Sequence, residues 1–112
     1  MKSNGNAFAQ ELARVKQAAV SDATEYLLET ANRTVPIEEA TLEGSGTATV
    51  EQDATVTRGV VAYDTPYALR QHEDTRLRHD PGRRAKWLER TAQEEAATIG
   101  RLIEGRLAGV AR

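Results

Sequence analysis

The stretch DTPYALRQHEDTRLRHDPGRRAKWL, residues 64–88, separates a helix and strands on its N-terminal side from a final helix on its C-terminal side. It begins at the end of a strand-like run, turns at Pro66, and turns again at Pro81-Gly82, because proline and glycine interrupt regular structure. Between the two turns, residues 70–84 are polar and hold both histidines of the chain. These residues are predicted to form a projecting loop that the rest of the chain supports.

Residues 6–32 have the pattern of a long amphipathic helix. Proline is absent from them, and apolar side chains recur at helical spacing, among them Phe8, Leu12, Val15, Ala19 and Tyr26. Pro36 cannot continue a helix and disfavours helical geometry at Val35, so the helix is expected to end near Asn32 or Arg33. Residues 1–5 are polar and are expected to fray.

Residues 47–63 have the composition of a β-hairpin, with Thr, Val and Ala alternating on both sides of a turn expected at Gln52-Asp53. Ala48 and Val50 are predicted to face one side of the first strand. On the second strand the predicted alternating set is Val56, Val60 and Ala62. Gly59 interrupts that strand and indicates a bulge or a close approach of another backbone.

Residues 83–107 are predicted to form a second helix, whose apolar stripe begins at Trp87 and Leu88, and residues 109–112 are expected to fray. Trp87 is interpreted as a core residue where the strands meet this helix. Together the patterns predict a single α+β domain over residues 1–112. Its parts are a long N-terminal helix, a small antiparallel sheet built on the hairpin, and a C-terminal helix packed on the sheet.

The composition predicts a lean core and an uneven distribution of charge. Hydrophobic residues make up 39% of the chain and aromatic residues only 4%, which favours oligomerisation as a further source of burial. Residues 1–69 hold five Lys/Arg and ten Asp/Glu, a net charge of −5. Residues 70–112 hold ten and seven, a net charge of +3. Opposite charges on the two parts can steer head-to-tail association of copies.

The sequence lacks the features of membrane and secreted proteins. It has no apolar run long enough for a transmembrane helix, and no basic segment followed by an apolar one at its N-terminus, so neither a membrane span nor a secretory signal is expected. The chain contains no cysteine, which excludes a disulfide framework and fits assembly in a reducing cytoplasm.

A metal site is the first chemical hypothesis for the loop, which holds two histidines and three carboxylates: His72, His79, Glu73, Asp74 and Asp80. The separation of the histidines fits none of the compact metal-binding motifs, and Arg70, Arg76 and Arg78 around them would repel a cation. A nucleophile motif is also missing, because Gly44-Ser45-Gly46 precedes a strand and not a helix. We therefore expect no enzyme activity, no metal and no cofactor.

The only basic cluster is Arg76, Arg78, Arg83, Arg84 and Lys86. It can neutralise phosphates, so a small oligomeric nucleic-acid-binding or regulatory protein that uses residues 76–84 is an alternative, and its affinity for DNA would fall steeply with salt. The cluster contains interspersed acidic residues and no interleaved aromatic ones, which argues against reading a base sequence. Contact with acidic residues of a neighbouring protein is the favoured interpretation.

The order of elements and three short motifs resemble the small neck proteins of tailed bacteriophages, also called minor capsid or tail-completion proteins of the head–tail connector module. The motifs are Pro66-Tyr67-Ala68, His72-Glu73 and Lys86-Trp87-Leu88, and the resemblance covers about residues 18–107. The segment around Val35-Pro36 and Leu42 is also similar, but Ala40-Thr41-Leu42 lacks the glycine of the family pattern. The missing glycine affects the turn geometry that the resemblance implies for this segment.

This resemblance implies a structural virion protein that forms a ring, commonly sixfold, between the capsid connector and the tail tube. The implied partners are copies of itself, adjacent head-completion and tail-tube proteins, and genomic DNA that passes through the lumen without sequence-specific binding. Stopper, neck ring and tail terminator are the possible stations, the tail-proximal neck being favoured. The protein would occur in the host cytoplasm during assembly and then in the virion. The interface residues expected are Tyr67, Arg70, His72, Glu73, Arg76, Arg78, His79, Arg83 and Arg84.

Overall fold

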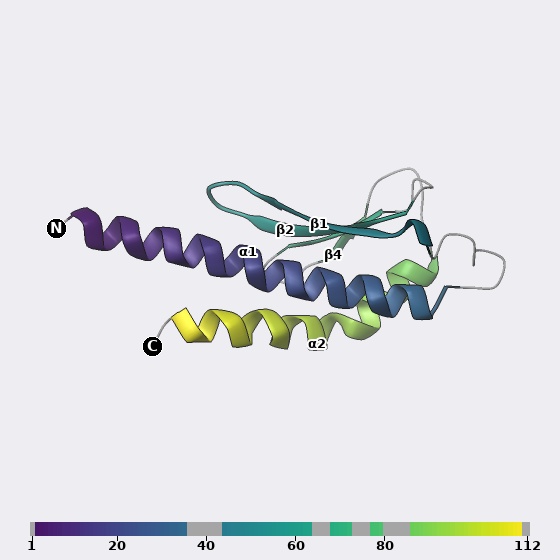
Figure 1. Cartoon of the computed structure of the whole chain (residues 1–112). Coiled ribbons are helices and arrows are strands. Elements are labelled where there is room, and N and C mark those ends of the chain that lie inside the picture. Colours follow the sequence, from purple (N-terminus) through teal and green to yellow (C-terminus); the bar gives the residue numbers. More distant parts are fainter. Residues whose placement is uncertain (1, 36–43, 64–67, 73–76, 80–85, 111–112) are drawn as a thin grey trace.

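A computed structural model describes residues 2–35, 44–63, 68–72, 77–79 and 86–110 of the chain and has the α+β fold expected from the sequence (Figure 1). The elements, in chain order, are α1 (Lys2–Arg33), β1 (Thr47–Gln52), β2 (Thr57–Ala62), β3 (Ala68–His72), β4 (Leu77–His79) and α2 (Lys86–Val110). The first helix ends at Arg33, as Pro36 predicts.

The strands form one antiparallel sheet in the order β1-β2-β3-β4. Helix α1 packs across β1 and β2, while α2 runs antiparallel along α1 and contacts the sheet at β4 (Figure 1). The N-terminal turns of α1 extend past the β1–β2 hairpin and past the end of α2, so the molecule is elongated, with dimensions of 58 × 23 × 21 Å. Neither helix has the length and apolar character together that a membrane span requires, within the residues described.

The hairpin register shows which residues of the two strands share a face. Ala48 and Val50, predicted to face one side, are both half-buried, while Val60 and Ala62 of the predicted alternating set lie on the other face of the sheet. The register pairs Ala48 with Val61. Directly opposite residues of an antiparallel pair lie on the same face, so Val61 is the core residue and has no exposed surface. The run of apolar residues from Val60 onward hides this alternation in the sequence.

Three predicted boundaries are wrong. The first strand continues through Gln52, and residues 53–56 form the turn, in which the backbone N–H of Asp53 donates to the carbonyl of Val56 at 3.0 Å. Helix α1 begins at Lys2, because one internal glycine costs a long helix only about 1 kcal/mol. For the same reason α2 continues through Gly109 to Val110.

The projecting loop predicted over residues 70–84 is also wrong where the structure describes this region. It contains most of β3 and all of β4. The second strand needs a partner for its outer backbone groups, and a segment with Leu69 and Leu77 provides one. The many charged residues of this segment obscure its strand pattern in the sequence.

The core is small and mainly aliphatic, as the composition predicts. Its buried members are Ala19, Val20, Ala23, Leu27, Ala31, Val61, Tyr63, Trp87, Leu88, Ala92, Ile99 and Ile103. Trp87 is confirmed as a core residue: its Nε1 donates a hydrogen bond to the Ala31 carbonyl at 3.2 Å, and its ring meets Tyr63 edge-on. Phe8 belongs to the predicted stripe of α1 but is 55% exposed.

Candidate functional site

The predicted interface residues fall on two neighbouring strands as far as they are described. Arg70 and His72 belong to β3, while Arg78 and His79 belong to β4. The other predicted members lie outside the described residues: Tyr67, Glu73, Arg76, Arg83 and Arg84. The described part of the candidate surface is therefore the β3–β4 side of the sheet.

The strand register brings two arginines of this surface together. Arg78 is directly opposite Arg70, and Arg70 is directly opposite Val60. Like charges that face each other across a strand pair are destabilising. We call these two register positions the arginine pair.

The same register separates the two histidines. His72 is opposite Arg58, whereas His79 is opposite Leu69. Leu69 and His72 are three positions apart on one strand, and strand positions alternate between the two faces of a sheet. The histidine positions therefore belong to opposite faces. Among the described residues, no group of His, Asp and Glu side chains is placed to hold a metal ion.

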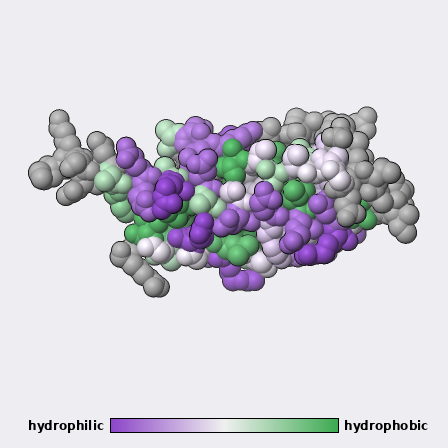
Figure 2. Space-filling model, viewed as in Figure 1, coloured by the Kyte–Doolittle hydropathy of each residue, from purple (hydrophilic) through white to green (hydrophobic). Residues whose placement is uncertain are grey.

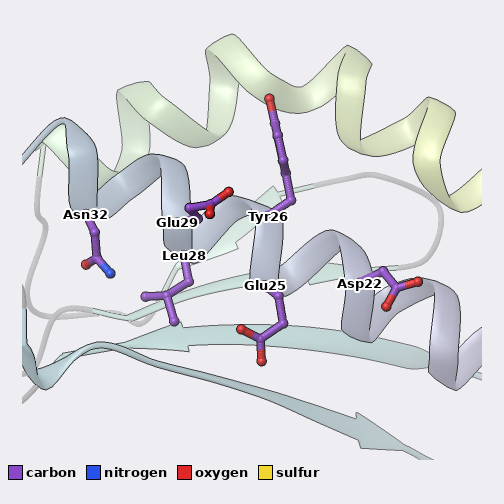
Figure 3. Close-up of a pocket in the computed structure, with 6 residues that line it drawn as sticks. All are labelled: Asp22, Glu25, Tyr26, Leu28, Glu29 and Asn32. Carbon is purple, nitrogen blue, oxygen red and sulfur yellow. The ribbon is translucent and has the colours of Figure 1, made fainter.

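An acidic surface lies on α1, and we call its three carboxylates, Asp22, Glu25 and Glu29, the acidic flank. They recur at steps of three and four and border an open groove of about 470 Å³, whose other lining residues are Tyr26, Leu28 and Asn32. Glu25 and Leu28 point from the helix toward the strands, whereas Tyr26 points toward α2 (Figure 3). The flank therefore runs along α1 between the sheet and the second helix.

Two carboxylates of the flank have cationic partners within the chain. The Asp22 carboxylate lies 3.2 Å from the guanidinium of Arg106 in α2. The Glu29 carboxylate lies 3.8 Å from the guanidinium of Arg33, which is also in α1. All four side chains are at least half exposed, and exposed ion pairs of this kind contribute little to stability. Glu25 has no ion pair with any residue that the structure describes. These carboxylates can therefore exchange their partners for those of another molecule at low cost.

The α2 side of the groove is held by a hydrogen bond that the Tyr26 hydroxyl donates to the Glu95 carboxylate. This bond raises the pKa of the tyrosine, since it favours the protonated hydroxyl. It joins the middle of α1 to α2, so α2 holds one of the residues that line the groove, while all of these residues belong to α1.

The sequence analysis missed the acidic flank. Its signal is the spacing of Asp22, Glu25 and Glu29, which puts three carboxylates on one helix face. Spacing alone does not show whether that face turns to solvent. In the space-filling view, hydrophilic side chains cover much of the visible surface and hydrophobic ones are scattered among them (Figure 2).

Comparisons of this chain with protein-family models, with curated protein sequences and with solved structures find no match. The fold and the two charged surfaces are therefore the observations on which a functional interpretation depends.

Proposed function

We propose that this chain is a structural virion protein of a tailed bacteriophage. In this role it is a ring-forming neck subunit, of the tail-completion or tail-terminator type, that joins the capsid connector to the tail tube. The observation that carries the proposal is the separation of charge in the fold. The acidic flank lies on α1, and the arginine pair lies on β3 and β4.

Two different complementary surfaces on one subunit favour head-to-tail contacts. Such contacts are heterologous, and they generate a closed ring when the rotation between neighbours divides a full turn. A two-fold dimer can pair the same two surfaces, since residue i of one copy then contacts residue j of the other and the reverse. The charge arrangement therefore supports association between copies, and a ring of six subunits is expected from the resemblance of the sequence to phage neck proteins.

The lean core gives a second reason for assembly. The largest fully buried side chains are only Leu27, Leu88, Ile99, Val61 and Thr57. A core of this size leaves a modest margin of stability for a single copy. Association with neighbours adds burial, and anything that binds the folded state alone stabilises it. In the proposed ring the neighbours are further copies, head-completion protein and tail-tube protein, with DNA passing through the lumen.

The proposal is tested by the mass of the isolated protein over a range of concentrations and by its presence in purified particles. Native mass spectrometry should show a closed oligomer, with six copies expected, and particle proteomics should detect the chain. A strictly monomeric chain that is absent from particles would contradict the proposal. Salt-sensitive binding of a monomer to short DNA duplexes would favour the nucleic-acid-binding alternative instead.

A pair of charge-reversal variants tests whether the basic cluster of residues 76–86 is needed for assembly or only for folding. The variant Arg83→Glu with Arg84→Glu should lose oligomers while its circular dichroism melt stays near that of the wild type. The matched control is Arg90→Glu with Arg101→Glu, which makes the same change of charge at two exposed positions of α2. Equal assembly of both variants would count against contacts between subunits through the basic cluster.

A further inference from the structure

The first strand forms an open edge of the sheet. All six residues of β1, TATVEQ, pair with β2 in one continuous register, and no described strand pairs with the other side of β1. Natural edge strands usually carry lysine, proline or a bulge that prevents pairing with another chain. This strand has no lysine, proline or bulge, although Glu51 is charged. No described residue pairs with its outer backbone groups, so the described part of the fold leaves this edge open to a partner strand.

The side chains of β1 leave room for such a partner. Thr47, Thr49 and Glu51 are exposed, while Ala48 and Val50 turn toward α1. Gly46, the residue before β1, lies against α1, since a Cβ on this glycine would be 2.7 Å from the Leu28 Cδ1 atom. Leu28 lines the groove beside the acidic flank. A strand added at this edge would therefore lie close to the flank.

The direction of the strands selects the partner. Each strand is antiparallel to its neighbour in the order β1-β2-β3-β4, so β1 and β4 run in opposite directions. A second copy, rotated about an axis parallel to the strands, brings its β4 beside β1 in antiparallel orientation. Every copy would then use one β1 edge and one β4 edge. Closure of the ring removes all open edges, which a pairing of β1 with β1 cannot do.

Charge supports the same partner. Strand β4 carries Arg78, which already faces Arg70 of its own sheet. Pairing with β1 of another copy would bring Glu51, whose register position is on the same sheet face as positions 70 and 78, beside this strand, in addition to its ion pair with Arg58 of its own chain at 3.6 Å. Opposite charges across a strand pair are stabilising, whereas a β1–β1 pairing adds acidic groups to acidic groups.

We propose that the outer edge of β1 pairs antiparallel with β4 of a second copy, so that the sheets of neighbouring subunits join into one continuous sheet around the ring. This inference rests on the proposed ring and identifies the contact that closes it.

The absence of cysteine from the chain allows a direct test by cross-linking. Arg78→Cys is combined in turn with Thr47→Cys, Thr49→Cys and Glu51→Cys, and each purified double variant is oxidised with diamide. Opposite residues of paired strands have Cα atoms about 4.5–5.5 Å apart, a distance that a disulfide spans. At least one pair should give a ladder of covalent oligomers that ends at the size of the ring. Arg78→Cys with Gln93→Cys, at an exposed position of α2, is the control.

The outcomes separate this inference from the proposed function. A wild-type ring whose three cysteine pairs cross-link no better than the control would overturn the β1–β4 pairing alone. Efficient covalent dimers from Thr49→Cys by itself would indicate a β1–β1 contact and also overturn it. A wild-type chain that stays monomeric at high concentration contradicts the ring and the pairing together.

A blocking variant gives an independent readout. Thr49→Lys places a cation at the exposed edge, beside an incoming strand that carries Arg78, and like charges across an interface repel each other. Ring assembly should weaken by at least about tenfold, without loss of the folded monomer. The control Gln93→Lys should assemble like the wild type. Normal assembly of Thr49→Lys would contradict the pairing.

Discussion

Gly59 of β2 lies directly against Thr24 of α1, so closely that a Cβ on the glycine would come within 1.9 Å of the Thr24 Oγ1 atom. Thr24 is buried, and its hydroxyl donates a hydrogen bond to the Val20 carbonyl at 2.5 Å. The position of the hydroxyl is therefore fixed by its own helix. Of the two sequence-based interpretations of Gly59, close approach is confirmed and a bulge is not, because the register with β1 and β3 is continuous.

Gly59→Ala should destabilise the fold, because the added methyl group needs space that the threonine occupies. Overpacking of this kind costs about 1–3 kcal/mol, which urea unfolding followed by circular dichroism can measure. Gly44→Ala is the control, since a Cβ at Gly44 would meet nothing within 4 Å. Equal stability of the two variants would show that α1 can move away from the sheet at no cost.

The loss in Gly59→Ala should be partly restored by Thr24→Ala, because this second change removes the Oγ1 atom that causes the worst contact. Residues in direct contact are not independent, so the two changes should show a coupling free energy of at least about 0.5 kcal/mol in a double-mutant cycle. The Thr24 Cβ would remain 3.1 Å away, which limits the recovery. Purely additive effects would contradict direct contact as the cause.

Gly105→Ala should stabilise the monomer. Gly105 lies inside α2, and a Cβ there would meet nothing within 4 Å, so alanine gains helix propensity without a clash. The expected gain is up to about 1 kcal/mol, measurable as an increase in the urea midpoint. A decrease would mean that this part of α2 is not helical in solution.

Trp87→Phe should destabilise the fold by about 1–3 kcal/mol, because it removes the indole hydrogen bond to the Ala31 carbonyl, which then keeps only its bonds from Thr34, and creates a void beside Tyr63. The tryptophan is the only one in the chain, so the comparison needs circular dichroism in place of fluorescence. Phe8→Leu is the control at an exposed aromatic position and should change stability by no more than about 0.5 kcal/mol.

The β1–β2 turn should make stability depend on pH through Asp53. The backbone N–H groups of Thr55 and Val56 both donate to its Oδ1 atom at 2.8 Å, and these bonds hold the pKa of Asp53 below its ordinary value of 3.8. A lowered folded-state pKa means that the stabilisation is present above the unfolded-state pKa. It is lost as the pH falls through the folded-state pKa.

The variant Asp53→Asn retains an acceptor oxygen but does not titrate. The stability difference between the wild type and this variant should therefore be largest above about pH 4 and should shrink as the pH falls below that value. Thermal melts over a pH series give the comparison. A difference that does not change with pH would show that the turn is equally stable with a protonated side chain.

The sequence predicts most directly those features that depend on local chemistry. Pro36 places the end of α1, and the helical stripe from Trp87 onward places the second helix and its buried tryptophan. Val60 and Val61 show where local reasoning fails, because both are apolar and only the pairing with β1 decides which one faces α1. Strand β3 is the second neighbour of β2, and β4 is the second neighbour of β3, which their charged sequences do not reveal. The acidic flank was missed because packing decides which side of α1 stays open.

Glu25→Lys should weaken assembly more than Glu94→Lys, although both variants change the net charge equally. Glu25 belongs to the acidic flank beside the groove, while Glu94 is an exposed residue of α2 outside the flank. If the flank receives a basic surface of a neighbouring copy, lysine at position 25 replaces attraction by repulsion at close range, whereas lysine at position 94 alters only the screened long-range field. Native mass spectrometry at several salt concentrations measures both effects. The defect of Glu25→Lys should persist at high salt, where a general charge effect would fade, and equal behaviour of the two variants would exclude the flank from the contact.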